Sequence, residues 1–272
     1  MVGIGPGDPA YLCGRARDVL TSVDAVAGYT LYIDLIRPLI SKTRIIQSAM
    51  TQEVDRVAAA ISEAVAGNSC AIVSSGDAGI YAMAGLALEI CRARGISLIP
   101  SGFGQKSQGS DLQSVNDDIS DKRSPAIYLE IVPGIPALAS GASLLGAPLT
   151  HDFACISLSD LLTPWETIEK RLEAASMADF VIVLYNPKSK RRSGHLETAQ
   201  QIFLKHRHKD TPVGIVTNAM RENQRVEIIR LSDLHLADVT MLSTVFIGNS
   251  TTFVYQDHLI TPRGYDQKYS MV

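Results

Sequence analysis

Short apolar runs rich in β-branched residues recur along the chain and alternate with amphipathic stretches of helical periodicity. In the first half, runs of strand length occupy residues 24–28, 44–47, 70–75 and 127–132. In the second half, they occupy residues 153–158, 180–185, 213–217, 226–231 and 244–248. Strands that alternate with helices favour an α/β fold, in which the helices cover a largely parallel sheet.

Three helices are expected between these runs. Residues 80–95 have helical periodicity and end at Gly95, a residue typical of the end of a helix. A further helix is expected over 164–176, with Thr163 as its N-cap. Residues 52–67 carry an apolar face formed by Val54, Val57, Ala58, Ile61 and Val65.

The number of strands and a break in the pattern near residues 145–152 predict two domains. The N-terminal α/β domain is expected over residues 1–148 and the C-terminal α/β domain over residues 149–272. A polar segment rich in glycine and serine, residues 102–125, interrupts the first domain. A loop of this length is either a tolerated surface insertion or a lid over a cleft, and the sequence leaves both readings open.

Composition and charge argue against several classes of function. The 28 acidic residues nearly balance the 25 basic ones, so no strong field attracts nucleic acid or a membrane surface. The longest apolar runs are strand length, too short to span a bilayer. The four cysteines form no CxxC pair and the six histidines no ligand pattern, so no metal site is expected. Because the sequence shows no export signal, we expect a cytoplasmic protein.

The loop VGIGPGDP, residues 2–9, has the glycine content of a nucleotide-binding loop. A dinucleotide fingerprint has the pattern G-x-G-x-x-G, but here Asp8 stands where the third glycine belongs. An acid at that position would repel a pyrophosphate, and no Gly-Lys-Ser/Thr follows to make a P-loop. Asp8 is expected instead to accept amide hydrogens of the helix that follows. Taken alone, the loop indicates only a tight turn.

Comparable loops follow several other predicted strands, at residues 76–79, 133–137, 186–187, 218–219 and 249–250. In an α/β fold, ligands bind outside the carboxyl ends of strands. These loops offer backbone amides and small residues, with Asp8 and Asp77 as the prominent charges and no cluster of bases. A phosphate site favours the opposite sign. A neutral or cationic adenosine-type ligand, such as S-adenosyl-L-methionine, fits better.

With these loops laid out, the chain resembles the tetrapyrrole (corrin/porphyrin) methyltransferases of cobalamin biosynthesis. The stretches that carry the resemblance are VGIGPGD, VSSGDAGIYAMAG, VPGIPALASGASLLGAPL and FVIVLYNPKSK. Further stretches point more narrowly to the precorrin-3B C17-methyltransferase branch: HDFACISLSDLLTPWETIEKRLEAA, TPVGIVTNAMRE and FIGNSTT. The likeness covers nearly the whole chain apart from residues 102–125.

The resemblance implies two α/β domains with S-adenosyl-L-methionine folded into the cleft between them, unlike the Rossmann-type methyltransferases, and a homodimer. The reaction that it implies is methyl transfer to C17 of precorrin-3B or cobalt-factor III, with contraction of the ring. The matching positions that it assigns to the cofactor are Pro6, Gly76, Asp77, Ile80, Ala137, Asn186 and Ala219. Two positions depart from the family pattern: Ala78 and Pro136 stand where the family usually has proline and threonine.

Residues for the chemistry and for the substrate are expected near these loops. Tyr29 follows a predicted strand, roughly where related methyltransferases carry an acid that faces the cleft, and is the candidate catalytic residue. A tetrapyrrole substrate carries many carboxylates, which basic side chains would bind. The candidates are Lys188, Arg191 and Arg221, although a solvated charge run explains the first two as well.

Three other functions remain open at this stage. Another tetrapyrrole C-methyltransferase, of the uroporphyrinogen or precorrin-4 step, would share most of these loops. Because of Ala78 and Pro136, a non-catalytic ligand-binding relative with a degenerate cofactor pocket also stays open. A nucleotide-dependent oxidoreductase is disfavoured by the missing third glycine.

Overall fold

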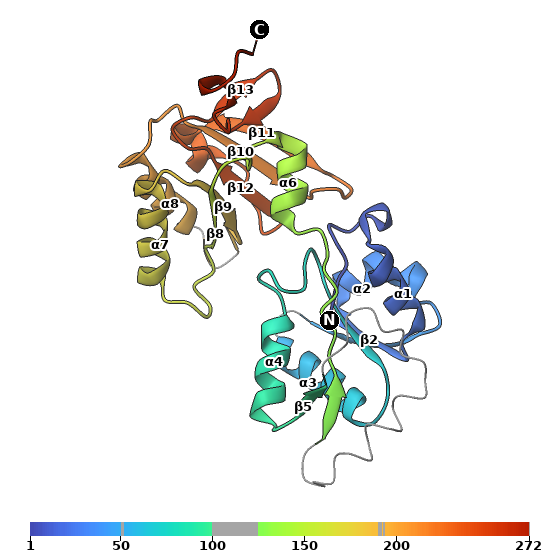
Figure 1. Cartoon of the computed structure of the whole chain (residues 1–272). Coiled ribbons are helices and arrows are strands. Elements are labelled where there is room, and N and C mark those ends of the chain that lie inside the picture. The colour runs from blue at the N-terminus through green and yellow to red at the C-terminus, as the bar shows by residue number, and fades with distance from the viewer. Residues whose placement is uncertain (50–51, 100–124, 190–191, 193, 272) are drawn as a thin grey trace. The chain divides into compact units, whose positions relative to one another are not determined.

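The computed structural model describes residues 1–49, 52–99, 125–189, 192 and 194–271 (Figure 1). The chain divides into two compact units, Met1–Pro136 and Ala137–Val272. The division falls ahead of residue 148, where the sequence suggested a boundary, because the helix that follows Pro136 packs on the second sheet. The polar segment 102–125 lies, except for Pro125, outside the described residues.

The first unit contains the α/β arrangement that the alternating pattern predicts. Its main sheet consists of β1 (Val2–Gly3), β2 (Ala25–Tyr29), β3 (Arg44–Ser48) and β4 (Cys70–Ser74), in the order β1-β4-β2-β3. All neighbouring strands in this sheet are parallel. Their carboxyl ends therefore share one edge. A smaller parallel pair joins β5 (Ser97–Ile99) to β6 (Ala126–Tyr128).

Helices cover both faces of this sheet (Figure 1). Along β4, Ala71 and Val73 pack on one side, while Ile72 packs on the other. Such alternation explains why β4 is apolar along most of its length. The first side is covered by α1 (Gly14–Ser22) and α2 (Thr30–Ile36), with the short 3-10 helix η2 (Arg37–Leu39). The 3-10 helix η1 (Pro9–Tyr11) lies in the loop between β1 and α1. The other side is covered by α3 (Glu53–Val65) and α4 (Ala84–Ala93).

The buried face of α3 differs from the face expected from the sequence. Val54 is 59% exposed and Val65 is 44% exposed, whereas Arg56 is only 3% exposed. Arg56 lies inside because its guanidinium donates to Ser48 Oγ and to the backbone oxygen of Ala49, each at 2.8 Å. Burial of an arginine is tolerated when its donors have acceptors, so the helix is rotated relative to its most apolar face.

The helix expected over 80–95 is confirmed in its second part. It begins at Ala84, because the residues before it continue the loop that follows β4. Its end is as predicted: Gly95 has a φ of +65°, and the amide of Ile96 donates to the oxygen of Cys91. This is the hydrogen bond of a glycine-terminated helix.

The second unit has a mixed sheet in the order β11-β10-β12-β9-β8. Its strands are β8 (Phe153–Ser157), β9 (Val181–Tyr185), β10 (Pro212–Thr217), β11 (Arg225–Arg230) and β12 (Ser243–Ile247). Strands β8 and β9 are parallel, and β12 runs antiparallel to both β9 and β10. The carboxyl ends of β8, β9 and β10 therefore meet at one edge, together with the start of β12.

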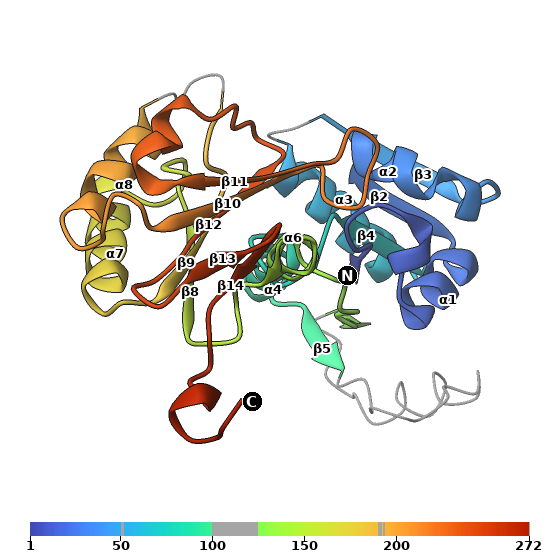
Figure 2. The same cartoon turned by 90° about the horizontal axis from the view of Figure 1, so that it is seen from above.

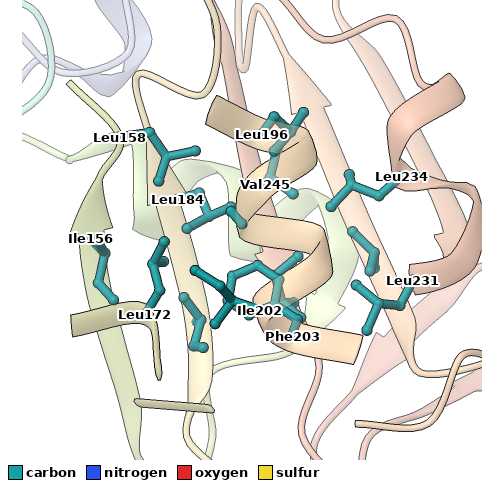
Figure 3. Packing of buried hydrophobic residues seen from close by; sticks show 14 of the residues in the cluster. Ile156, Leu158, Leu172, Leu184, Leu196, Ile202, Phe203, Leu231, Leu234 and Val245 are labelled. Atoms are coloured by element: carbon teal, nitrogen blue, oxygen red, sulfur yellow. The ribbon is translucent and has the colours of Figure 1, made fainter. Parts of the chain in front are cut away.

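Other elements cover both faces of this sheet (Figure 2), and a hydrophobic core lies against each face. One face packs against α7 (Trp165–Met177), α8 (His195–Leu204) and the 3-10 helix η3 (Leu231–Leu236); Figure 3 shows Leu172, Leu196 and Phe203 among its side chains. The other is covered by α6 (Ala137–Leu145) and a small sheet of β7 (Gly146–Ala147), β13 (Phe253–Tyr255) and β14 (His258–Ile260). A 3-10 turn, η4 (Tyr265–Gln267), follows this sheet.

The N-cap prediction for α7 is wrong by one residue. Pro164, with an extended ψ of 140°, precedes the helix as its cap, and Trp165 is the first helical residue. Proline has no amide hydrogen to lose at this position, and Thr163 lies in the preceding loop. Among the described residues, no helix combines the length and the apolar composition needed to cross a bilayer.

Candidate functional site

Three loops of the first unit meet at the carboxyl edge of its sheet. The loop after β1 and the loop after β4 exchange two backbone hydrogen bonds: Gly5 N to Gly76 O at 3.0 Å and Gly76 N to Gly5 O at 2.7 Å. The third segment joins because Gly3 donates to the oxygen of Val132 at 3.0 Å. Residues far apart in the sequence thus form one backbone junction.

The backbones at this junction approach so closely that a side chain would not fit, which explains its glycines. A Cβ on Gly134 would lie 2.2 Å from the oxygen of Gly76. A Cβ on Gly3 would lie 2.7 Å from the nitrogen of Gly134. Gly5 and Gly76 also have left-handed φ values, +69° and +68°. The glycines of the first loop are therefore explained by packing of three backbones and need no phosphate.

Both prominent acids of these loops accept backbone amide hydrogens. Asp77 accepts from Gly79 at 2.8 Å and from Gly134 at 3.0 Å, so it links the β4 loop to the 133–137 loop. Asp8 accepts from Ala10 at 2.8 Å and caps η1, which confirms the helix-capping role predicted for it. Asp77 shapes the loop that carries it, and its direct contact with a cofactor stays a prediction.

The other predicted contacts of the first unit lie at the same edge. Pro6 and Gly76 are buried within the junction, whereas Ile80 is 36% exposed and the neighbouring Tyr81 is 53% exposed. Tyr81 has a positive φ of 51°, a strained value for a bulky residue. The loop thus presents two large apolar side chains to solvent on a rigid backbone.

The departure at Ala78 leaves this loop intact. Ala78 is fully buried in the core beneath α4, and its oxygen accepts from the amide of Ala84 at 3.1 Å. With Asp77 accepting from Gly79 on the other side, the turn is closed without a proline. Pro136 is the last residue of the first unit, immediately before α6.

Tyr29 ends β2 and precedes α2, so it also lies at the carboxyl edge. Its ring is half-buried and meets Tyr32 edge to face, with 5.3 Å between centroids. This contact holds the ring of Tyr29 in place. A fixed ring at this edge is compatible with a packing role and with a catalytic role of the hydroxyl. Its catalytic role remains a prediction.

In the second unit, the first turn of α6 lies at the carboxyl end of β9. The amide of Leu138 donates to the hydroxyl of Tyr185 at 2.8 Å, which places Ala137 at this edge. Asn186 follows Tyr185 with a positive φ of 50°, and its side chain donates to Ser157 Oγ at 2.9 Å. Ala219 follows β10 and packs under α6. The structure therefore brings Ala137, Asn186 and Ala219 to one edge of this sheet.

The structure places the basic residues in this region, predicted to bind the substrate, in different surroundings. Lys188 and Arg221 are half-buried in the loops after β9 and β10, at this same edge. Arg191 lies outside the described residues. Arg192 turns inward: its Nη1 donates to the oxygens of Leu158 at 2.9 Å and Asn186 at 3.2 Å. It is a structural cation that the sequence did not separate from its neighbours.

Arg192 belongs to a cluster that sequence reasoning missed. Asp160 forms an ion pair with Arg192 Nε at 3.7 Å, and its other carboxylate oxygen lies 3.6 Å from His195 Nε2. The imidazole of His195 stacks on the ring of Trp165 at 4.0 Å. These residues come from the stretches SLSDLLTPWE and NPKSKRRSGH. The two stretches lie about 30 residues apart in the sequence, and no local pattern indicates that they meet.

Two further features lie away from these edges. Burial raises the pKa of Cys70, which begins β4 at the opposite edge of its sheet, from 9.0 to about 11, so the thiol stays protonated at neutral pH. A hollow of about 820 Å³ lies over β11 and is lined by Val226, Arg230 and Val254 among others. None of the predicted site residues that the structure describes lines it.

Comparison with known proteins places these observations in a family. The model of the tetrapyrrole (corrin/porphyrin) methylases matches residues 1–100 and 118–235. A cobalt-factor III methyltransferase of Priestia megaterium is 45% identical over 271 residues, which are 100% of this chain and 46% of that protein. A probable cobalt-factor III C(17)-methyltransferase of Salmonella typhimurium is 40% identical over 97% of this chain and 98% of its own length.

A solved structure agrees with these sequence relatives. The crystal structure of the methyltransferase CobJ superposes with a TM-score of 0.80 and 27% identity, over 96% of this chain and 98% of that one. The two-domain α/β fold expected from the sequence is thus confirmed. The chain spans less than half the length of the Priestia megaterium protein but nearly all of the Salmonella typhimurium protein.

Proposed function

This chain belongs to the tetrapyrrole (corrin/porphyrin) methylases, and on that premise we propose that it methylates C17 of a corrin precursor in cobalamin biosynthesis. The substrate is cobalt-factor III or precorrin-3B, and methylation is coupled to contraction of the ring. The observation that carries the proposal is the near full-length similarity to a relative named for the cobalt-factor III C(17) reaction.

We infer that the methyl donor is S-adenosyl-L-methionine, which supplies an electrophilic methyl group on a sulfonium when bound. The loops at the first edge suit this ligand because they offer exposed apolar side chains, Ile80 and Tyr81, and carboxylates held by amides. Asn186, Ala137 and Ala219 are the contacts proposed from the second sheet. The proposed contacts include no arginine or lysine, which suits a cation better than a phosphate.

The work assigned to the protein is orientation. Bound S-adenosyl-L-methionine would supply its methyl group by in-line displacement, in which the bond from sulfur to methyl is exchanged for a bond from methyl to C17 and S-adenosylhomocysteine is the leaving group. Holding the reacting atoms in line contributes roughly 7 kcal/mol or more to such a step. The backbone junction of Gly5, Gly76 and Gly134 suits this task because its loops are fixed by hydrogen bonds rather than by flexible side chains. Tyr29 is proposed to hold or move a proton at its hydroxyl near the macrocycle.

Basic side chains bind the carboxylates of the substrate in this proposal. Lys188 and Arg221 occupy suitable positions in the loops after β9 and β10, and Arg191 is assigned by sequence alone. Arg192 takes no direct part, because its guanidinium is bound to Leu158, Asn186 and Asp160. We also propose that the protein acts as a homodimer in the cytoplasm; sedimentation of the purified chain tests the first part.

The test is incubation of the chain with S-adenosyl-L-methionine and either cobalt-factor III or precorrin-3B, followed by mass analysis. The expected product has gained one methyl group, with one S-adenosylhomocysteine formed for each. Transfer only to uroporphyrinogen or precorrin-4 would assign the chain to another methylation step. Binding of S-adenosylhomocysteine without any transfer would indicate a non-catalytic relative.

A further inference from the structure

The loop between β8 and α7, residues 158–164, carries the two most exposed large apolar side chains among the described residues. Leu161 is 78% exposed and Leu162 is 94% exposed. Isolated exposed leucines are common on protein surfaces, but two adjacent ones at the tip of one loop form a small apolar surface. This loop leaves the carboxyl end of β8, the edge that also holds Asn186 and the first turn of α6.

The loop is held by polar contacts at its base. Arg192 donates to the oxygen of Leu158, where the loop begins, and pairs with Asp160 at 3.7 Å. The other oxygen of Asp160 lies 3.6 Å from His195 Nε2, and His195 Nδ1 lies 3.3 Å from the oxygen of Leu158. Trp165, at the end of the loop, stacks on the ring of His195. Both ends of the loop that carries the two leucines are therefore held by side-chain contacts.

Arg192 also connects the leucine loop to the loop after β9, which carries the proposed cofactor contact Asn186. Arg192 Nη1 donates to the oxygen of Asn186 as well as to the oxygen of Leu158. The side chain of Arg192 is 14% exposed, so it serves as an internal brace. Movement of the leucine loop would thus disturb the loop after β9, and the reverse.

We propose that Leu161 and Leu162 contact an apolar face of the tetrapyrrole substrate, and that Asp160 is a positioning residue that holds them in place. This inference rests on the proposed function. The occupant follows from the chemistry of this edge of the sheet: the loop after β8 carries an apolar surface, and the loop after the neighbouring parallel strand β9 carries the basic side chain of Lys188. A macrocycle with apolar faces and carboxylates around its rim has the complementary arrangement. Covering exposed leucine side chains also supplies hydrophobic free energy to binding.

The experiment compares the full-length chain with Leu161→Ser/Leu162→Ser, Asp160→Asn and a control, Leu236→Ser. Leu236 is a leucine of similar exposure, 75%, in η3 of the same unit. Cobalt-factor III binding is followed by absorbance, S-adenosylhomocysteine binding by calorimetry, and unfolding by urea. The double serine variant should bind cobalt-factor III about tenfold more weakly, as expected for losing part of two leucine contacts. Its affinity for S-adenosylhomocysteine and its unfolding midpoint should match those of the wild type, and the control should change none of the three.

The positioning role of Asp160 is tested separately, by the steady-state kinetics of Asp160→Asn. Asp160→Asn should raise KM for the tetrapyrrole severalfold with a smaller change in kcat, because the leucines remain present but less firmly held. Equal tetrapyrrole affinity in the wild type and the double serine variant overturns the inference and leaves the proposed function standing. So does a variant that loses S-adenosylhomocysteine binding, or one that changes from dimer to monomer in light scattering. A wild type that binds S-adenosylhomocysteine but neither cobalt-factor III nor precorrin-3B contradicts both proposals.

Discussion

The amide nitrogen of Gly134 donates a hydrogen bond of 3.0 Å to Oδ2 of Asp77, across 57 residues of sequence. Asp77 also accepts from Gly79 through its other oxygen. One carboxylate therefore fixes its own turn and ties it to the loop that leads to Pro136. Such charge-assisted bonds to backbone amides are about twice as strong as neutral ones, which makes Asp77 the central polar link of the first edge.

Replacing Asp77 with alanine should lower both stability and cofactor affinity. Two amides lose their acceptor, so we expect a loss of about 2 kcal/mol in the free energy of unfolding. S-adenosylhomocysteine should bind about tenfold more weakly, because the loop carrying Gly76 and Ile80 loses its link to Gly134. Urea unfolding and calorimetry measure the two effects.

The control for this variant is Asp8→Ala. Asp8 is exposed, and its carboxylate accepts the local amide of Ala10, so its loss should remove about 1 kcal/mol or less, as for a helix cap. Weaker cofactor binding in Asp77→Ala with an unchanged unfolding midpoint would mean that Asp77 contacts the cofactor directly rather than through the loop.

Gly134→Ala should disrupt the backbone junction. The new Cβ would stand 2.2 Å from the oxygen of Gly76, and neither backbone can yield without breaking the junction. Overpacking of this kind lowers the free energy of unfolding by about 3 kcal/mol. The matched control is Gly85→Ala in α4, where an added Cβ meets nothing within 4 Å and alanine favours the helix. A Gly134→Ala protein as stable as Gly85→Ala would show that the loops do not approach so closely.

Tyr29→Phe tests the proposed chemistry. The change keeps the ring that meets Tyr32 and removes only the hydroxyl, so stability should remain near that of the wild type. If the hydroxyl holds or moves a proton, kcat should fall about 100-fold, as for loss of a general acid or base. Tyr32→Phe is the control from the same ring pair. Equal kcat in the wild type and Tyr29→Phe would leave Tyr29 a packing residue.

Because the thiol of Cys70 is half-buried, we expect a loss of stability at alkaline pH. Burial raises its pKa from 9.0 to about 11 in the folded state. The stabilising contribution is therefore complete below pH 9 and is lost between pH 9 and about 11, where the unfolded chain releases the proton and the folded chain retains it. Urea unfolding at several pH values across this range should show a steeper decline for the wild type than for Cys70→Ala. Parallel declines would place the thiol in contact with water.

Much of the fold follows from local patterns. The apolar runs locate β2, β3 and β4 of the first main sheet and all five strands of the second, but not the two-residue β1. The most buried strands, such as β4 and β9, stand out because both of their faces are covered. Gly95 marks the end of α4 for a purely local reason, its left-handed φ. Helix α1 escaped this reasoning because GRARDVLTS buries only Ala16 and Leu20. Such a short apolar face gives little periodicity.

The sequence could predict the location of site residues only where the direction of the strands places their loops at one end of the sheet. Parallel strands bring their carboxyl ends to one edge, so the loops carrying Gly76 and Tyr29 could be grouped in advance. The inward turn of Arg192 could not, because its partner Leu158 is 34 residues away and the contact depends on the pairing of β8 with β9. Sequence alone made Arg192 one of several similar surface cations.

The central claim is that this chain delivers a methyl group to C17 of the macrocycle. The most direct measurement is a reaction with S-adenosyl-L-methionine carrying a ¹³C-labelled methyl group and cobalt-factor III or precorrin-3B, with the label located in the product by NMR. We predict a single enriched methyl group bonded to C17 of a contracted ring. Enrichment at another carbon of the macrocycle, or none, would contradict the account.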